Sequence, residues 1–566
     1  VGRSAFANCT SLTTITNPER LTGAFNNAFE NCTSLESLDI SGLRIAQSNL
    51  FAGCTSLTQV TMSSDTNLGV GMFANCTSLE SIVIKASKVP DMAFYGCTNL
   101  KTVTFEGSVD YIGEQAFSGC SSITLITLPD GTYTLGENAF DGCTSLTKVT
   151  FGQGTNLQGD IILPFEGCTS LAKIEVDANN ENYASVGGVL YDKQKTTVLF
   201  VPVLATGYTI PDSVTKVGAS AFAGNTNLTT IDLSRYEEIG AYAFAGTGLR
   251  TVTIPAALTA ISEGMFANAT QLSSVSFDTN AQLTTVGDYA FENCNMLSQI
   301  VLPETVTEIG DGAFLGCSAV RSIKLTNVQI IGTEAFSGTG ISKITAKNTT
   351  TLKDGAFWGM SSLVQADLGA ITEMGDLVFV ETMVVNNGTY YPYGLTKLSK
   401  VTFAEGTTVI GARAFITALR SEYDSLTEVV IPNTVETIGA SAFYGRSKLT
   451  TLNLSGVKTV GEQAFYNCSS LTGLDLTSVE TIGAAAFANT TALKVAEMPS
   501  LKEVGVSAFQ NSGIDTLVVN SLEVVDGFAF ANTKIKSLTI PSSLSSYTYD
   551  ESWTEINTNG DPEEIK

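Results

Sequence analysis

The stretch IGDGAFLGC, residues 309–317, returns in varied form about every 22 residues along almost the whole chain. Its phenylalanine is the most regular position, and an apolar segment typical of a β-strand, here residues 320–325, follows three residues later. A repeat of this length indicates a solenoid, in which one small unit stacks on the next around a continuous core. The repeating phenylalanines number 22: Phe6, Phe29, Phe51, Phe73, Phe94, Phe117, Phe140, Phe165, Phe222, Phe244, Phe266, Phe291, Phe314, Phe336, Phe357, Phe379, Phe415, Phe443, Phe465, Phe487, Phe509 and Phe530.

Each repeat has three apolar landmarks, which are clear in residues 449–465. Leu452 and Leu454 alternate with polar residues, as expected of a strand with one buried face. Val460 then precedes Gly461, a residue suited to a tight turn or a positive φ. About ten residues connect this glycine to the next strand, too few for a long helix. The pattern predicts a β-rich solenoid with one long parallel sheet and short 3₁₀ or extended segments opposite it.

The repeat predicts two columns of stacked side chains inside the solenoid, here called ladders, one of phenylalanines and one of cysteines or other small residues. All 11 cysteines lie three residues after a repeat phenylalanine, and the equivalent sites elsewhere, such as Asn225 and Thr247, share small size. We therefore expect buried free thiols, although occasional strained disulfides between neighbouring repeats stay open; thiols on one side of a ladder do not surround zinc. The predicted ladder residues include Phe6, Phe29, Phe51, Phe73, Phe94, Phe117, Phe140, Phe314, Phe465, Cys32, Cys54, Cys76 and Cys97.

These motifs resemble a known family. The Leu-x-x-Ile-x-Ile-Pro strand, the Ile-Gly corner and the Ala-Phe-x-x-Cys-x-x-Leu run are similar to BspA-like leucine-rich repeats, including those of a treponemal surface protein, over nearly the whole chain. The resemblance implies a leucine-rich-repeat right-handed superhelix in a secreted or surface-anchored bacterial protein associated with adhesion. It supplies no catalytic or cofactor residues.

Charge and composition exclude several classes of partner. The net charge is −25 and the chain has no histidine, which argues against nucleic acid and anionic lipid as ligands. No apolar run reaches the 18 or more residues of a membrane span, so no membrane insertion is expected in this fragment. The chain starts at Val1 in the middle of a repeat, and we interpret it as a fragment or processed product whose signal or anchor lies elsewhere.

Interruptions of the repeat define the expected domains. The first insertion contains the segments GGVLY (187–191) and TVLFVP (197–202), typical of a β-hairpin, and is either a structural elaboration or a recognition element. The predicted divisions are a repeat array at 1–176, a β-hairpin insertion at 177–211, a repeat array at 212–379, a Tyr-rich loop at 380–397, a repeat array at 398–541, and a C-terminal cap with an acidic tail at 542–566.

Tyrosines in the second insertion are the candidate binding residues. Tyr390, Tyr391 and Tyr393 stand in the predicted loop, and Tyr423 lies in a shorter insertion at 416–424. Tyrosine offers a rigid apolar face with a polar tip, which suits protein surfaces and sugar rings. The alternative is that these rings pack back onto their own repeats. The threonine-rich outward face of the sheet is either a broad docking surface or simply solvated.

The C-terminal segment has two further interpretations. Tyr547, Tyr549 and Trp553 are suited to fold over the last open repeat as a cap. Alternating oxygen ligands at 557–563 loosely resemble a calcium loop, but the spacing of an EF-hand is missing, and an acidic tail is the simpler interpretation.

A binding role fits the sequence better than catalysis. The chain lacks histidine, has no Gly-Lys-Ser/Thr phosphate loop and spreads its carboxylates around the repeats, so we expect no enzyme activity and no cofactor. The favoured function is that of a monomeric secreted or cell-surface protein that binds an extracellular protein or glycan. The alternative is an acidic structural spacer that holds another domain away from the cell envelope.

Overall fold

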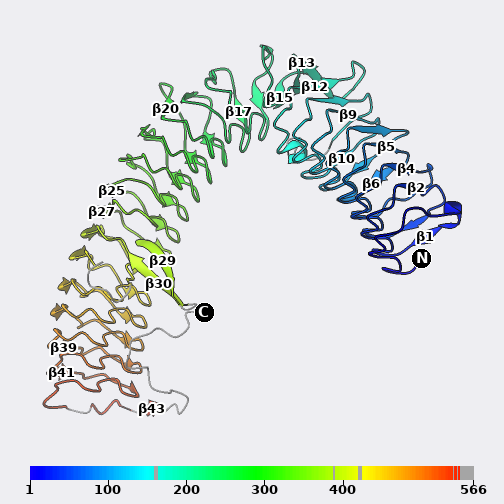
Figure 1. Ribbon diagram of the computed structural model, residues 1–566. Coiled ribbons are helices and arrows are strands. Elements are labelled where there is room, and N and C mark those ends of the chain that lie inside the picture. The colour runs from blue at the N-terminus through cyan, green and yellow to red at the C-terminus, as the bar shows by residue number, and fades with distance from the viewer. Residues whose placement is uncertain (158–162, 387–388, 418–423, 539–540, 545, 549–566) are drawn as a thin grey trace. The chain divides into compact units, whose positions relative to one another are not determined.

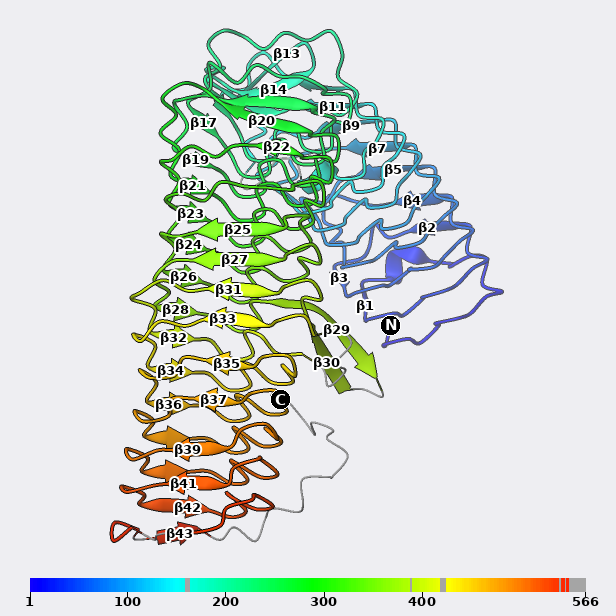
Figure 2. The same ribbon diagram turned by 90° about the vertical axis from the view of Figure 1, so that its left-hand side faces the viewer.

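The computed structural model describes residues 1–566 except 158–162, 387–388, 418–423, 539–540, 545 and 549–566. The chain forms two compact units. Unit 1 comprises residues 1–229 and 235–248, and unit 2 comprises residues 230–234 and 249–566. Within each unit the repeats, here called rungs, stack on one another (Figures 1 and 2). Tyr549, Trp553 and the tail at 557–563 lie outside the described residues, and so does Tyr423.

A typical rung contributes two short strands. In the rung of Phe266, the face strand β18 (Thr251–Ile254) alternates exposed and buried side chains, and the corner strand β19 (Ala260–Ile261) precedes a turn that leads to the phenylalanine. Both strands pair in parallel with their equivalents in the next rung. The predicted parallel β-solenoid is therefore confirmed. Among the described residues, the only helices are the 3₁₀ helices η1 (Pro18–Arg20) and η2 (Leu163–Phe165).

The strands of unit 1 fall into three groups. The face strands are β2 (Ser37–Asp39), β4 (Gln59–Thr61), β5 (Ser81–Ile84), β7 (Thr102–Phe105), β9 (Leu125–Leu128), β11 (Lys148–Phe151) and β12 (Lys173–Val176). The corner strands are β1 (Gly23–Ala24), β3 (Ile45–Ala46), β6 (Lys88–Val89), β8 (Tyr111–Ile112), β10 (Thr134–Leu135), β16 (Lys216–Val217) and β17 (Glu238–Ile239). The first insertion adds β13 (Tyr183–Val186), β14 (Val189–Asp192) and β15 (Thr197–Phe200).

Unit 2 repeats the same arrangement. Its face strands are β18, β20 (Ser274–Phe277), β22 (Gln299–Ile300), β25 (Lys343–Ala346), β27 (Gln365–Leu368), β31 (Lys400–Thr402), β33 (Glu428–Val430), β35 (Thr451–Leu452), β37 (Gly473–Leu474), β39 (Val495–Glu497) and β41 (Thr516–Val518). Its corner row consists of β19, β21 (Thr285–Val286), β23 (Glu308–Ile309), β24 (Ile330–Ile331), β26 (Thr351–Leu352), β28 (Glu373–Met374), β32 (Val409–Ile410), β34 (Thr437–Ile438), β36 (Thr459–Val460), β38 (Thr481–Ile482), β40 (Glu503–Val504), β42 (Val524–Asp526) and β43 (Ser546–Thr548). The second insertion forms β29 (Val380–Asn386) and β30 (Thr389–Gly394).

The face row is divided into short parallel sheets rather than being continuous. In unit 2, one sheet has the order β18-β20-β22 and the next has the order β25-β27-β31-β33. The strand expected over residues 320–325 is not formed, and this rung separates the two sheets. The corner row, by contrast, forms sheets of up to seven strands, such as β32-β34-β36-β38-β40-β42-β43. The corner that the sequence indicated only as a turn thus carries its own sheet.

Stacked phenylalanine rings run through both cores. In unit 1 the centroids of neighbouring rings from Phe6 to Phe165 are 5.2 to 5.9 Å apart. In unit 2 the rings from Phe266 to Phe530 are 4.8 to 6.2 Å apart. Nearly all are buried, although Phe6 in the first rung is 45% exposed. Burial of each ring stabilises the stack by about 1.5–3 kcal/mol.

The cysteines form a hydrogen-bonded ladder of free thiols. All 11 are free, and all except Cys9 are buried. Each buried thiol donates to a phenylalanine carbonyl of the preceding rung, as Cys317 Sγ does to Phe291 O at 3.0 Å. At the same position Thr339 Oγ1 donates to the carbonyl of Phe336 in its own rung, at 2.9 Å. Where this site holds cysteine or threonine it therefore supplies a hydrogen-bond donor as well as a small side chain, whereas Ala269 at the same position supplies none.

Glycine at the corner is required by close packing rather than by its φ. Gly310 does not have a positive φ, yet a Cβ there would lie 2.7 Å from the backbone nitrogen of Asp288 in the neighbouring rung. Positive φ occurs instead at positions flanking the phenylalanine, where asparagine or glycine is common, as at Asn293 (φ 55°) and Gly316 (φ 74°).

Candidate binding site

The second insertion is a β-hairpin rather than the predicted loop. β29 and β30 pair antiparallel, with Val385 opposite Tyr390, Val384 opposite Tyr391 and Thr382 opposite Tyr393. Figure 2 shows the two strands leaving the stack of rungs in unit 2. The sequence Asn386-Asn387-Gly388 between β-branched and aromatic segments is a typical hairpin signal. The prediction of a loop was wrong because it did not take this hairpin signal into account.

The structure describes the candidate tyrosines to different extents. Tyr390 and Tyr391 are placed by their backbone in β30, and Tyr393 is partly buried near the base of the hairpin. Tyr423 lies outside the described residues, so its role as a binding residue stays a prediction. Three tyrosines thus sit on one strand that projects from a rigid scaffold.

The base of the hairpin is tied to the neighbouring rung. Val380, the first residue of β29, is fully buried. Gly394, the last residue of β30, donates its N–H to Thr417 Oγ1 at 3.2 Å. Thr396 N–H donates to the carboxylate of Glu381 at 2.9 Å. Both strands therefore leave the core from fixed positions.

A fully buried ion pair lies beneath this base. Arg446 Nη1 and Asp424 Oδ1 are 3.1 Å apart, and neither side chain is exposed. Arg446 occupies the cysteine position of its rung, and its Nε donates to Phe415 O just as a thiol would. Asp424 also accepts the N–H of Lys448 at 2.8 Å. Burial lowers the pKa of Arg446, while Asp424 acts in the opposite direction.

Arg446 and the hairpin are in direct contact through Gly394. A Cβ on Gly394 would overlap the guanidinium of Arg446, so a larger residue at the end of β30 would require that guanidinium to shift. Arg446 Nη2 has no hydrogen-bond partner among the described residues. An unpaired buried donor is costly, and the arrangement is consistent with a residue retained for positioning rather than for stability.

An apolar column accompanies the hairpin. The residue that follows each repeat phenylalanine is mostly small or polar, but in five successive rungs it is Trp358, Val380, Ile416, Tyr444 and Tyr466. These side chains pack together, and the rings of Tyr444 and Tyr466 stack at 5.0 Å. Large residues at this position are a sequence signal that the search for interruptions of the repeat overlooked. These large residues lie in the rungs next to the base of the hairpin, and they include Val380, the first residue of β29.

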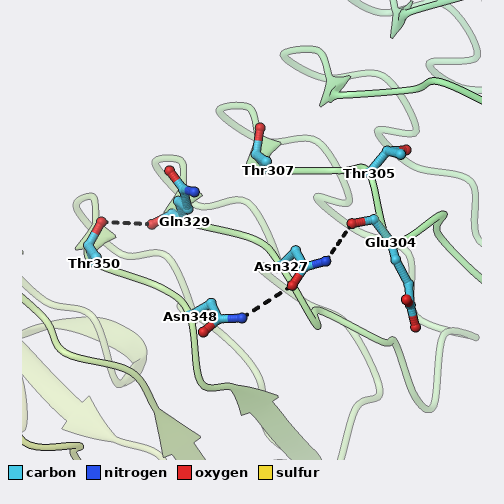
Figure 3. A pocket seen from close by; sticks show the side chains of 7 residues that line it. All are labelled: Glu304, Thr305, Thr307, Asn327, Gln329, Asn348 and Thr350. Atoms are coloured by element: carbon cyan, nitrogen blue, oxygen red, sulfur yellow. Dashed lines mark hydrogen bonds between the residues drawn. The ribbon is translucent and has the colours of Figure 1, made fainter.

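A second candidate surface is an open polar groove on unit 2. Figure 3 shows the side chains that line it, which come from three successive rungs and form two rows. Asn348 Nδ2 donates to Asn327 Oδ1 at 3.2 Å, and Asn327 Nδ2 donates to the carbonyl of Glu304 at 2.7 Å. The groove encloses about 670 Å³. It presents amide and hydroxyl groups in a regular array, without an aromatic anchor.

Charged residues are arranged along the stack instead of converging. Lys458 pairs with Glu436 at 3.0 Å and Lys502 with Glu480 at 2.6 Å, each one rung apart. Within the described ranges, no group of three or more metal-binding side chains is close enough to hold a metal ion. The same part of the chain contains no helix with the length and hydropathy of a membrane span.

Comparisons with known proteins identify the repeat. The family model described as "BspA type Leucine rich repeat region" matches in six copies, over residues 1–89, 87–186, 203–296, 284–404, 420–536 and 500–558. A comparison with curated proteins found no match.

Several solved structures are similar to this chain. A leucine rich cell surface protein from Faecalibacterium prausnitzii is 26% identical, with a TM-score of 0.40, and the match covers 57% of this chain and 82% of the other. A leucine-rich repeat protein from Bacteroides ovatus is 20% identical, with a TM-score of 0.39, covering 75% of this chain and 82% of the other. One from Eubacterium ventriosum is 17% identical, with a TM-score of 0.26, covering 94% and 90%.

Proposed function

Because this chain belongs to the BspA-type leucine-rich repeat family, we propose that it is a non-enzymatic binding protein of the bacterial cell surface. The proposed site is the hairpin β29–β30 with Tyr390, Tyr391 and Tyr393, and the partner is an extracellular protein or glycan. The main support for this proposal is that the base of the hairpin is anchored in the neighbouring rung. The hairpin that carries the tyrosines is held at its base by buried contacts of both strands.

The anchored base favours recognition for an energetic reason. A binding element that is ordered before it meets its partner loses little conformational entropy on binding. Tyrosine adds a large contact area with few rotatable bonds. A pure spacer gains nothing from a buried ion pair placed under a projecting hairpin, whereas a binding protein needs the hairpin at a fixed angle.

The test is a binding screen of the purified chain against extracellular-matrix proteins and a glycan array. A variant with Tyr390, Tyr391 and Tyr393 all changed to Ala is measured beside it, and we expect it to lose binding while its unfolding midpoint stays nearly unchanged. The matched control changes three exposed tyrosines outside the hairpin, Tyr95, Tyr133 and Tyr289, to Ala.

Three other outcomes point elsewhere. Binding that survives the triple change would move the site to the polar groove of Figure 3 or the threonine-rich face. A large loss of stability in the triple variant would assign the tyrosines to the core. No binding to any partner would favour the acidic spacer, which the net charge of −25 suits.

A further inference from the structure

An apolar pocket lies in unit 1, beside the first insertion. It encloses about 760 Å³, and most of its wall is apolar. The pocket spans four successive rungs, those of Phe165, Phe200, Phe222 and Phe244, and its wall includes Phe165, Leu171, Phe200, Val203, Leu204 and Tyr242. Leu204 is 43% exposed, whereas Phe165 and Phe200 are buried. This pocket is separate from the hairpin of unit 2.

The pocket arises because one rung has a shortened turn. In a regular rung the phenylalanine is followed by a turn that ends in a cysteine or another small residue. Between the rungs of Phe165 and Phe222, the segment Val201–Ala205 replaces that turn. Val201 keeps the regular register, since its N–H donates to Ala221 O at 2.8 Å. Leu204 then folds back, and its N–H donates to Leu171 O at 2.9 Å.

The shortened turn leaves two backbone groups without their usual partners. In regular rungs the N–H two residues after the phenylalanine donates to the next rung, as Gly142 does to Glu166 O at 3.3 Å and Gly224 does to Ala245 O at 2.8 Å. Among the residues that the structure describes, the equivalent N–H of Gly167 has no acceptor and the equivalent carbonyl of Ala223 has no donor. Both residues line the pocket.

The pocket therefore combines an apolar wall with one backbone donor and one backbone acceptor. This combination matches a polypeptide, in which a side chain fills the wall while the main chain supplies a carbonyl and an N–H. A hydrocarbon chain would leave both backbone groups unsatisfied, and a lipid ester or carboxylate, which has no N–H, would leave the carbonyl of Ala223 without a donor. Among the lining side chains only Glu166 is charged, and the whole chain is acidic, so basic residues beside the apolar side chain are favoured.

We propose that this pocket is a second binding site, which takes a short polypeptide segment of a partner protein. The segment replaces the missing turn, with one carbonyl accepting from Gly167 N–H and one N–H donating to Ala223 O. Its apolar side chain lies against Phe165, Phe200 and Leu204, and Lys or Arg flanks that side chain.

The experiment measures binding of the full chain to a positional-scanning array of dodecapeptides. We expect enrichment of Leu, Ile, Met or Phe at one position with Lys or Arg nearby. Leu204→Arg places a charge in the pocket at a half-exposed site, and it should weaken the selected peptides at least about tenfold. The control is Leu125→Arg on β9, where the side chain is 54% exposed and outside the pocket; it should leave affinity unchanged.

A second measurement tests the backbone contacts without altering the protein. Each amide of the best peptide is N-methylated in turn, and methylation of a single position should abolish binding because the donor to Ala223 O is lost. The proposal is overturned when no peptide binds the unaltered chain, when Leu204→Arg binds as well as the control, or when no N-methylated position matters. The hairpin triple variant should bind the peptides normally, so this result is independent of the proposed function.

Discussion

The two insertions interrupt the same repeat but become different kinds of structure. The first, in unit 1, is absorbed into the core: its strands β13, β14 and β15 continue into the corner strands β16 and β17 as one sheet. Its Tyr183 and Tyr191 are buried. The second, in unit 2, leaves the stack as the hairpin β29–β30. Insertion length alone does not predict which outcome occurs.

The phenylalanine ladder explains the difference. Phe165 and Phe222 are 57 residues apart, an interval that has room for an additional rung. The first insertion provides the missing ring, because Phe200 stacks on Phe165 at 6.1 Å. Phe379 and Phe415 are 36 residues apart, and their rings stack directly at 4.8 Å. The second insertion has no gap in the ladder to fill, so it is free to project.

The largest expected effect is that of Phe200→Ala. Removing a buried ring that stacks on Phe165 should destabilise unit 1 by about 3–5 kcal/mol, because the transfer free energy is lost and a cavity is left. Urea unfolding followed by circular dichroism measures the change. The matched variant Tyr393→Ala in the second insertion should shift the midpoint much less. Equal losses would remove the distinction between the two insertions.

Breaking the ion pair under the hairpin should cost nearly as much. Arg446→Met leaves Asp424 buried and unpaired, which is expected to destabilise unit 2 by about 3 kcal/mol. It should also loosen the hairpin, measured as faster amide hydrogen exchange in β29 and β30.

The double variant Arg446→Cys with Asp424→Asn provides the control. It restores the cysteine of the ladder and removes both charges, so it should recover most of the stability. Because the guanidinium against Gly394 is gone, exchange in the hairpin should stay fast. Slow exchange in the double variant would show that Arg446 does not position the hairpin.

Two tyrosines of the first insertion should respond in opposite directions. Tyr183 donates its hydroxyl to Leu157 O at 3.0 Å, so Tyr183→Phe should cost about 1 kcal/mol. The hydroxyl of Tyr191 has no partner among the described residues, and Tyr191→Phe should stabilise unit 1 by about 1 kcal/mol. Urea midpoints measured at neutral pH test both signs.

The same tyrosines make unit 1 sensitive to alkali. Burial raises the pKa of Tyr183 and of Tyr191 above the ordinary tyrosine value. Their contribution to stability is therefore full below about pH 10 and is lost as the pH rises through the folded-state pKa values. The double variant with Phe at both positions should lose less stability between neutral and alkaline pH than the unaltered chain. An equal loss would contradict the prediction.

Much of this fold could be predicted from the sequence, because the repeat encodes it directly. The spacing of the phenylalanines gives the rung, and the alternation around Leu452 gives the parallel face strands. The corner row was not foreseen, since two-residue strands leave no alternation to detect. The role of Phe200 was also missed, because its ring stacks on Phe165 from within an insertion that lacks the repeat motif.

The candidate site was predicted less completely. The tyrosines were identified by composition, and Asn387-Gly388 carried a hairpin signal that was not used. The pairing of Arg446 with Asp424 could not be predicted, because it joins residues of different rungs and depends on how the insertion at 416–424 folds. Arg446 at a cysteine position was the visible anomaly.

The smallest expected effect on stability comes from removing most of the hairpin. Replacing residues 383–392 by Asn-Gly, a favourable two-residue turn, keeps Val380, Gly394 and the ladder rings in place. We expect the urea midpoint to change by no more than a surface substitution would, about 0.5 kcal/mol, while binding in the partner screen is lost. A loss of stability approaching that of Phe200→Ala would instead mean that the second insertion is part of the core like the first. The stability of the stacked rungs would then depend on both insertions.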